Sequence, residues 1–340
     1  MLFLGFLVGF LVAPSVFGLA PSSLIVQNKG GGHGEIGYHT AIALSNIGHK
    51  VTLLQDSSCD NTKEPFASYP SLPSSVTVVP CSMSTLPSSV TSSTYHTIID
   101  NYSKSPDSPF SQALCDLGKT CSKYLYISSA GIYDPPPTHG TDDGGPLLES
   151  FPVKETKGQA QFEDLLSSSS VPLFAFRPQY IYGPKANKFS YLDWYFSRIT
   201  SSKPLPIPGT GKQMVSLTNA VDVADLLKSC TESENAIPGV YNCGSGKVYS
   251  YNEVASMCGK VANMDAHIVN YNADVKGKGE FPFRPNNFHV VPTKAKETWG
   301  WEGGNMDLEG DLKWYYDDFL KRGGGGGGFE KDEEILAVEA

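Results

Sequence analysis

Three patterns are missing from this sequence, and each absence disfavours a class of function. None of the 17 tyrosines is followed by a lysine four residues later, the pair through which many reductases move protons. The seven cysteines include no Cys-x-x-Cys motif. The two that are closest in the sequence, Cys115 and Cys121, do not have the spacing of a zinc site. An odd number of cysteines without such a framework predicts reduced thiols that are buried or half-buried, and therefore a reducing compartment.

Charge is also missing, from the whole of residues 1–28. The apolar run 1–12 is shorter than a membrane span and is better described as the apolar part of a cleavable signal, although it lacks the usual basic start. Residues 15–21, Ser-Val-Phe-Gly-Leu-Ala-Pro, resemble the cleavage context of plastid presequences in algae with secondary plastids. We therefore expect a presequence over 1–23 that leads to the reducing plastid stroma. Ordinary secretion or a signal anchor is the alternative.

The formal charge is −9, so the bulk of the protein repels nucleic acid and any polyanion site must be a local basic patch. Residues 177–212 form such a patch in the sequence, with six basic residues and one acidic residue. An ordinary solvated surface is the alternative explanation. The end of the chain, 329–340, is acidic, with five acidic residues and one basic residue.

The order of the expected elements indicates the fold. Short apolar strands are expected at 24–27, 51–54, 76–79, 96–99, 124–128 and 173–177, with helices at 36–46, 111–122 and 153–167. Such alternation predicts an α/β protein with a Rossmann-type, doubly wound parallel sheet and right-handed crossovers. Beyond 177 the pattern loosens, and helices near 221–229, 250–261 and 308–321 predict a smaller C-terminal lobe.

These patterns divide the chain into four parts. They are the presequence 1–23, a dinucleotide-binding-like domain 24–176, a lobe for substrate or RNA 177–322, and a glycine linker with an acidic tail 323–340. The six consecutive glycines at 323–328 predict a flexible linker.

A glycine motif follows the first expected strand, with Gly31, Gly34 and Gly37 spaced as G-x-x-G-x-x-G. There the first glycine permits a tight turn, the second lets the backbone approach a pyrophosphate, and the third lets the helix pack on the strand. A glycine turn without ligand is the alternative, and Glu35 would weaken binding if it pointed inward. Asp56, 19 residues after Gly37, is placed to accept bonds from a ribose, which favours NAD over NADP unless it only forms a turn.

Several spaced motifs follow. They are Ser128-Ser129-Ala-Gly-Ile-Tyr133, Arg177-Pro178-x-x-x-Tyr182-Gly183-Pro184, Pro206-Ile-Pro-Gly-x-Gly211, Asn219-Ala-Val-Asp-Val-Ala224, Gly239-Val-Tyr-Asn-Cys243 and Trp299-Gly-Trp-Glu302. With them the chain resembles the extended and atypical short-chain dehydrogenase/reductases over about residues 24–321.

That resemblance implies that Ser129 polarises a substrate carbonyl, and that a tyrosine and a lysine act beside it at positions that fall on Glu155 and Gln159. Gln159 has no charge to stabilise a tyrosinate, and Glu155 ionises far below tyrosine, so neither can do the same work. A tyrosine hydroxyl bonded to a lysine amine next to Ser129 would restore the redox function.

One branch of the family is matched more closely. The residues that carry this match are Phe176-Arg-Pro-Gln-Tyr180, Val240-Tyr-Asn-Cys243, Phe281-Pro-Phe-Arg284 with His289, and Phe329-Glu followed by Asp332-Glu-Glu-Ile-Leu336. They resemble the chloroplast stem-loop-binding proteins, which bind and are held to cleave plastid messenger and ribosomal RNA and also lack the tyrosine–lysine pair. The resemblance implies a chloroplast stromal protein in RNA and ribosome-associated complexes, homo- or hetero-oligomeric, with no membrane contact after presequence removal. The six-glycine linker and the short presequence depart from that branch.

RNA binding by this chain would use basic and aromatic residues together. The basic residues expected on phosphates are Arg177, Lys185, Lys188 and Arg284, with Lys276, Lys278, Lys294 and Lys296 near them. The aromatic residues expected to stack bases are Tyr180, Tyr182, Trp194, Phe281 and Phe283, for which a place in the core is the alternative.

Cleavage of RNA requires activation of a 2′-hydroxyl or a water molecule. The candidate groups are His33, Asp100, His139, Asp142, Asp143 and Glu155. A divalent cation such as Mg²⁺ held by carboxylates is the expected route, with its ligands unassigned, because no histidine pair stands out.

Two other functions stay open. In the first, the chain is an NAD-dependent nucleotide-sugar epimerase or dehydratase in which Ser129, Tyr133 and Glu155 act on the sugar. In the second, it is a non-catalytic scaffold that binds nucleotide and assembles RNA–protein complexes. Any NAD held by an RNA-binding protein of this kind is expected to be vestigial or structural.

Overall fold

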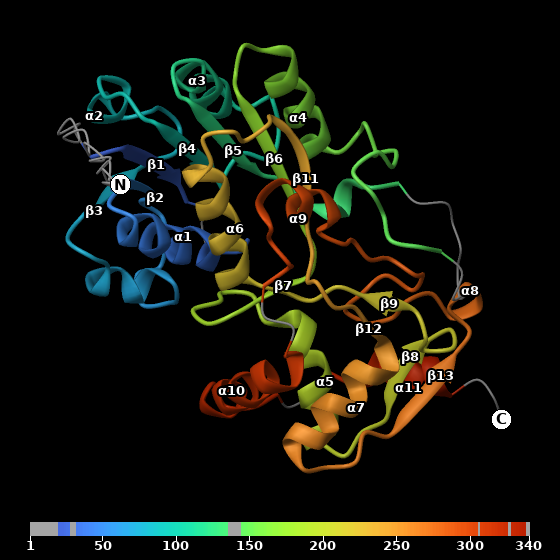
Figure 1. Cartoon of the computed structure of the whole chain (residues 1–340). Helices are drawn as coiled ribbons and strands as arrows, with labels where there is room; N and C mark the ends of the chain where they lie inside the picture. Colours follow the sequence, from blue (N-terminus) through green and yellow to red (C-terminus); the bar gives the residue numbers. More distant parts are fainter. Residues whose placement is uncertain (1–19, 28–31, 135–143, 305–306, 326–327, 338–340) are drawn as a thin grey trace, which may run out of the picture.

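A computed structural model of the chain describes residues 20–27, 32–134, 144–304, 307–325 and 328–337. Its centre is a sheet of seven parallel strands in the order β11-β6-β5-β4-β1-β2-β3 (Figure 1). The strands are β1 (Ser22–Val26), β2 (Lys50–Asp56), β3 (Val76–Cys81), β4 (Thr97–Asp100), β5 (Lys123–Ile127), β6 (Leu173–Pro178) and β11 (Gly239–Cys243). The predicted α/β doubly wound fold is confirmed.

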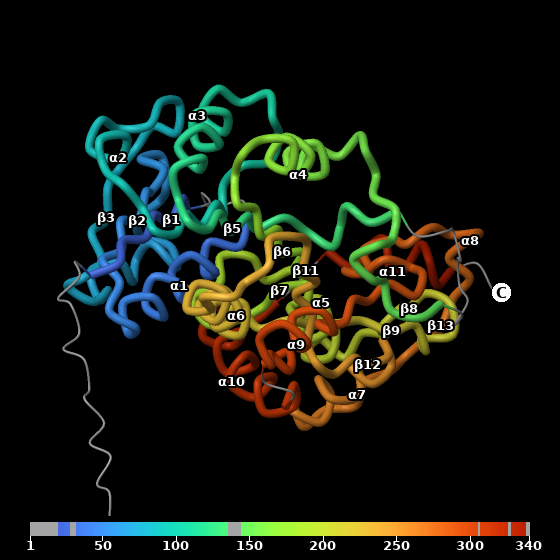
Figure 2. The backbone as a smooth tube through the Cα atoms, turned by 45° about the horizontal axis from the view of Figure 1, so that its top comes forward, coloured from blue at the N-terminus to red at the C-terminus, as the bar shows by residue number. Residues whose placement is uncertain are grey.

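Helices cover both faces of the sheet because the strands are apolar on both sides. In β1, Ile25 packs with α1 (Gly34–Asn46) and α6 (Ala220–Glu232). Its neighbours Leu24 and Val26 pack on the other face, with α3 (Pro109–Gly118) and α4 (Gly158–Ser168). Figure 2 shows these two pairs of helices on opposite sides of the sheet. The sheet therefore lies in the middle of a three-layer sandwich.

Two helical segments differ from expectation. The helix expected at 153–167 begins only at Gly158, because Val153 pairs with Tyr133 and the Lys154 N–H donates to the Ile132 carbonyl. Between β2 and β3, where the sequence predicts no helix, the chain forms a 3-10 helix, η1 (Phe66–Ser71).

A second cluster of apolar side chains forms the core of the smaller lobe. Its helices are α5 (Ser190–Thr200), α7 (Tyr251–Ala262) and α10 (Leu308–Lys321). Its strand pairs are β8 (Leu205–Pro208) with β13 (Ile268–Tyr271), and β9 (Met214–Val215) with β12 (Tyr249–Ser250). Between the lobes β7 (Ile181–Tyr182) pairs with β10 (Thr218–Asn219), after which α6 and β11 return the chain to the large sheet. The short helices are α2 (Ser88–Thr91), the 3-10 turn η2 (Ala130–Ile132), α8 (Ala273–Lys276) and α9 (Thr293–Trp299).

The acidic end of the chain forms a helix, α11 (Glu330–Leu336), that packs near β8 in the smaller lobe (Figure 2). Asp332 of this helix is buried and accepts a hydrogen bond from Arg198 Nε at 2.6 Å. Lys203 pairs with Glu333 at the surface. Two cations of the basic stretch 177–212 thus meet the acidic tail, and they are not free to hold a polyanion.

All seven cysteines lie in the described ranges and are free thiols; six are buried and Cys59 is half-buried. This agrees with the thiol state expected from the sequence. Across the residues that the structure describes, no helix is both long enough and apolar enough to cross a membrane.

Candidate functional site

A cleft lies where the carboxyl ends of the central strands meet the smaller lobe. The register pairs Val26 with Asp100 and Asp100 with Tyr126, so the residues that follow β1, β4 and β5 emerge at the same edge. The cleft has a volume of about 250 Å³. The side chains that line it and carry polar groups include His33, Asn101, Ser129, Gln159, Lys188 and Tyr191.

The glycine motif opens α1 beside this cleft. Gly31 lies outside the described residues. A Cβ on Gly37 would come within 2.4 Å of Gln27 Oε1, so this position holds the helix close to β1. The Gln27 amide donates to the Gly34 carbonyl and to the Tyr69 hydroxyl, and its oxygen accepts from Asn101. Gln27 therefore holds the first turn of α1 in place beside β1.

The described part of the loop does not fit a dinucleotide held in the usual way. Pro65 and Asn187 side-chain atoms lie 3.2 and 3.3 Å from where a Cβ of Gly34 would be, so this glycine is covered. Asp56 is buried and accepts bonds from the Ser58 N–H and hydroxyl at 2.8 and 2.7 Å. The cleft volume also falls below the roughly 300–1,000 Å³ of ordinary ligand pockets. We derive no reaction step through NAD.

At the start of α1, where a dinucleotide would be held, titratable side chains form a cluster. His33 Nδ1 lies 2.9 Å from Glu35 Oε1, and the Glu35 side chain is fully buried. In the orientation that satisfies both ends of its amide, Asn187 donates to Glu35 Oε2 at 3.2 Å. The Tyr191 ring stacks on the His33 ring at 6.3 Å between centroids, and Lys188 Nζ lies 5.1 Å from the Tyr191 centroid.

The three residues expected to be catalytic are not brought together. Ser129 lines the cleft, and its hydroxyl accepts from the Gly131 N–H at 3.0 Å. Glu155 is exposed in the segment before α4 and is absent from the cleft lining, whereas Gln159 lines it. Tyr133 is buried away from the cleft, where its hydroxyl donates to Asn242 Oδ1 at 2.7 Å. Burial raises the pKa of Tyr133 to about 12.

Replacing Tyr133 by phenylalanine tests its place in the core. We expect the free energy of unfolding to fall by about 1–3 kcal/mol, because Asn242 Oδ1 loses its buried donor. The RNA binding and cleavage expected from the sequence should change by less than about twofold, since the hydroxyl faces Asn242. Denaturant unfolding and an activity assay on the same preparation measure both. A large loss of activity with unchanged stability would place Tyr133 in the chemistry after all.

Of the four basic residues expected on phosphates, Lys188 lines the cleft. Arg177 is buried and its Nε donates to Glu163 at 3.1 Å, which leaves it unavailable to a surface phosphate. Lys185 pairs with Glu64 at 2.8 Å. The Arg284 guanidinium lies 3.8 Å from the Phe288 ring centroid and donates to the Gly131 carbonyl, and burial lowers its pKa.

The aromatic residues expected to stack bases belong mostly to the core. Tyr182, Trp194, Phe281 and Phe283 are all buried in the apolar cluster of the smaller lobe. Tyr180 is half-buried and lines the cleft, where its hydroxyl accepts from the Arg284 N–H. The core position left open for these rings therefore holds for these four residues, because periodicity alone does not separate a buried ring from an exposed one.

The candidates for RNA cleavage also separate. His139, Asp142 and Asp143 lie outside the described residues. Asp100 is buried and accepts from the Tyr102 and Ser103 N–H groups and the Tyr124 hydroxyl; its burial raises its pKa. Of the candidates within the described residues, only His33 lines the cleft. Within the described ranges there is no group of three or more metal-ligating side chains.

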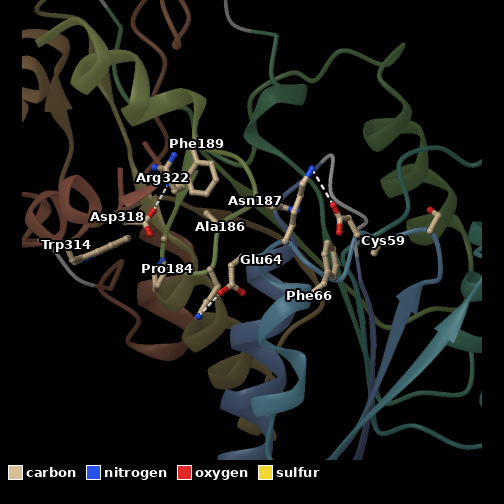
Figure 3. Close-up of a pocket in the computed structure, with 15 residues that line it drawn as sticks. Cys59, Glu64, Phe66, Pro184, Ala186, Asn187, Phe189, Trp314, Asp318 and Arg322 are labelled. Atoms are coloured by element: carbon tan, nitrogen blue, oxygen red, sulfur yellow. Dashed lines mark hydrogen bonds and ion pairs between the residues drawn. The ribbon is translucent and has the colours of Figure 1, made fainter. Parts of the chain in front are cut away.

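A larger cavity, of about 830 Å³, lies on the other side of Asn187 (Figure 3). It is walled by Phe66, by the segment 183–189, and by Trp314, Asp318 and Arg322 of the C-terminal part. The Arg322 guanidinium lies over the Phe189 ring at 3.6 Å and pairs with Asp318 and Asp193. Its charge is therefore balanced within the protein.

Sequence reasoning missed Asn187 and Tyr191. In reductases of this type the lysine follows the tyrosine by four residues, and the sequence has no such pair. In the cleft the lysine comes first: Lys188 Nζ lies 3.4 Å from the Tyr191 hydroxyl, at the N-terminal end of α5. The spacing Lys-x-x-Tyr was visible in the sequence, but nothing local indicated that α5 would face Ser129.

Comparisons with known proteins give the chain its relatives. The model of the NAD dependent epimerase/dehydratase family matches residues 110–244. The chloroplast stem-loop binding protein of 41 kDa b of Arabidopsis thaliana is 32% identical over 204 residues, 58% of this chain and 52% of that protein. A trifunctional UDP-glucose 4,6-dehydratase, epimerase and reductase of the same plant is 24% identical over 59% of this chain and 30% of its own length. The chain thus spans about half or less of these relatives.

Solved structures show the same fold. UDP-glucuronic acid 4-epimerase from Bacillus cereus in complex with NAD superposes with a TM-score of 0.69, at 16% identity, over 88% of this chain and 99% of the other. A dTDP-glucose 4,6-dehydratase from Bacillus anthracis in complex with NAD gives 0.65, at 15% identity, over 88% and 97%. At these identities the likeness concerns architecture.

Proposed function

We propose that this chain, which is related by sequence and fold to the NAD-dependent epimerase/dehydratase family, is a plastid protein that binds stem-loop RNA and cleaves it. The observation that carries the proposal is the cleft at the glycine motif. Beside it, Pro65 and Asn187 cover Gly34 and the Ser58 N–H donates to Asp56, while histidine, lysine and tyrosine side chains line the cleft. The 32% identity to a stem-loop binding protein supports the same conclusion.

Binding of RNA by an acidic protein requires a local site. Lys104 and Lys188 line the cleft, and Arg284 lies at the adjoining Gly131 carbonyl. Tyr191 adds a half-buried ring that stacks with His33 and Phe283. Together these supply a few positive charges and an aromatic wall, which suits an unpaired nucleotide in a loop better than a duplex.

A divalent cation remains part of the proposed cleavage activity. Mg²⁺ is commonly held by one or two carboxylates together with substrate phosphates, so it does not need a preformed cage of protein ligands. Omission and re-addition of Mg²⁺ during cleavage of a stem-loop RNA tests this requirement. Cleavage that persists in a chelator would remove the metal from the proposal.

Filter binding of a stem-loop RNA across a salt series tests the RNA-binding part. We expect the logarithm of affinity to fall linearly with the logarithm of salt, with a slope of about −2 to −3 for three or four phosphate contacts. Lys188→Met should reduce the size of the slope by about 1. Lys119→Met, which removes an exposed lysine outside the cleft lining, is the matched control and should leave the slope unchanged. Excess NAD should not displace the RNA. Affinity that is indifferent to salt, or equal for any acidic polymer, would contradict specific recognition.

The same relative, whose name places it in the chloroplast, supports the proposal of a plastid location. Residues 1–19 lie outside the described part of the chain, so the proposal of a presequence rests on their sequence. Fusing residues 1–30 to a fluorescent protein in an alga with secondary plastids tests it. Retention of the fusion in the secretory pathway would favour ordinary secretion instead.

A second function has one specific observation in its favour. The Tyr191 hydroxyl and Lys188 Nζ lie 3.4 Å apart in the cleft that Ser129 also lines. This is the type of pair whose presence beside Ser129 would restore epimerase or dehydratase chemistry on a nucleotide sugar. Incubation with a panel of nucleotide sugars, followed by chromatography of the products, separates this function from RNA cleavage.

A further inference from the structure

The histidine of the glycine motif and the glutamate two residues later form a hydrogen-bonded pair at the edge of the cleft. We propose that His33 is the general base that removes the proton from the attacking 2′-hydroxyl of RNA, and that Glu35 positions it. This inference rests on the proposed function and adds the residues that perform the cleavage.

The geometry orients one ring nitrogen toward Glu35. Nδ1 of His33 is 2.9 Å from Glu35 Oε1, and the glutamate has no exposed side-chain surface. Asn187 holds the second carboxylate oxygen at 3.2 Å. A buried carboxylate held by two partners cannot turn away, so it fixes the orientation of the imidazole.

This arrangement selects the tautomer that a base needs. A carboxylate that accepts from Nδ1–H leaves Nε2 with its lone pair, and Nε2 is then the nitrogen available to substrate. The His33 side chain is 19% exposed and lines the cleft. In the described part of the chain, no hydrogen-bond partner of Nε2 competes with a substrate hydroxyl.

The groups beside His33 are an aromatic ring and a cation, which suit the ribose and the phosphate of an RNA chain. The Tyr191 ring is nearly parallel to the His33 ring, with 16° between their planes. Lys188 Nζ lies 5.1 Å from the same Tyr191 ring, so the ammonium of Lys188 and the imidazole of His33 both lie beside Tyr191. An ammonium at this place attracts the scissile phosphate and can supply a proton.

The step balances within these groups. The 2′-oxygen forms a bond to phosphorus while its proton passes to Nε2 of His33. The bond from phosphorus to the 5′-oxygen of the next nucleotide breaks, and that oxygen takes a proton from the Lys188 ammonium. The products are a 2′,3′-cyclic phosphate and a free 5′-hydroxyl, and no oxidant or reductant is consumed.

Cleavage kinetics of a stem-loop RNA by the full chain, in the presence of Mg²⁺, test the proposal. We expect His33→Gln to lower kcat about 100-fold or more, the usual range for loss of a general base, with KM within about threefold. His267→Gln, at an exposed histidine of the smaller lobe, is the matched control and should cleave like the unaltered protein. Added imidazole should raise the cleavage rate of His33→Gly at least tenfold.

Further measurements separate positioning from folding and identify the attacking group. Glu35→Gln should lower kcat about tenfold with KM unchanged, and RNA affinity should stay within about twofold. We expect kcat of the unaltered protein to rise with pH, and His33→Gln should lose this rise. A single 2′-deoxy substitution at the cleaved position should stop the reaction, and the products should carry 2′,3′-cyclic phosphate ends.

The outcomes distinguish this inference from the proposed function. Cleavage by His33→Gln at the normal rate, or products with 5′-phosphate ends, would overturn the role of His33 while leaving an endoribonuclease. Binding of RNA without any cleavage by the unaltered protein would overturn both the cleavage activity and its base. A folded His33→Gln protein that also fails to bind RNA would show that His33 acts in binding, which contradicts the proposal.

Discussion

Replacing Glu163 by glutamine is expected to lower the free energy of unfolding by about 3–5 kcal/mol. Glu163 and Arg177 are both buried, and Nε of the arginine donates to Oε1 of the glutamate at 3.1 Å. The arginine also lies over the Tyr133 ring at 4.8 Å. Removing the carboxylate charge leaves the guanidinium buried without its counter-ion, which is a severe loss. Denaturant unfolding followed by circular dichroism measures the change.

Two matched variants serve as controls for this prediction. Asp116→Asn breaks an exposed pair with Lys119 and should cost less than about 1 kcal/mol. The double variant Glu163→Leu with Arg177→Met removes both charges and should recover most of the loss, because apolar groups of similar volume can replace a buried pair. If Glu163→Gln instead leaves stability intact and strengthens RNA binding, Arg177 holds phosphate as the sequence first indicated.

Replacing Asp332 by alanine is expected to release the C-terminal helix and to destabilise the smaller lobe by about 3 kcal/mol. Asp332 is the carboxylate that faces the buried Arg198, and the arginine lies over the Trp194 ring at 4.2 Å. Without Asp332, that guanidinium is uncompensated beside the apolar cluster of the lobe. Limited proteolysis should cut the chain after the glycine run in the variant much faster than in the unaltered protein.

Glu333→Ala is the control for this second prediction. Glu333 neighbours Asp332 in α11 and pairs with Lys203 at 3.2 Å, but both side chains are exposed. Loss of a surface pair costs about 0–1 kcal/mol. Equal proteolysis of the two variants, both as resistant as the unaltered protein, would mean that the tail does not depend on the Arg198 pair.

Much of the fold could be predicted because it depends on local patterns. The strand expected at 51–54 lies within β2, and the one expected at 173–177 lies within β6. Apolar runs of this length separated by helical periods admit few arrangements other than a parallel sheet covered on both faces. The late start of α4 was hidden, because the pairing of Val153 with Tyr133 is a contact between residues far apart in the chain.

The site was less predictable because its residues come from distant segments. Ser129 could be identified since it follows a buried strand at the edge where ligands bind. Lys188 was expected on phosphate from its charge alone, and it does line the cleft. Arg177 has the same charge, but its partner is Glu163 from α4, and no pattern of basic residues reveals such a pairing.

By itself, the sequence determined the parallel sheet, the glycine motif at the start of α1, the reduced cysteines and the absence of a lysine four residues after any tyrosine. These features depend on the order of residue types within short windows, where burial and backbone geometry decide the outcome. Only the tertiary structure decided which charges are neutralised, which rings are buried, and that His33, Glu35, Lys188 and Tyr191 share one cleft. Those outcomes depend on how the fold brings the N-terminal ends of α1 and α5 to one cleft. The reason is that a charge or a ring takes its function from neighbours supplied by other parts of the chain.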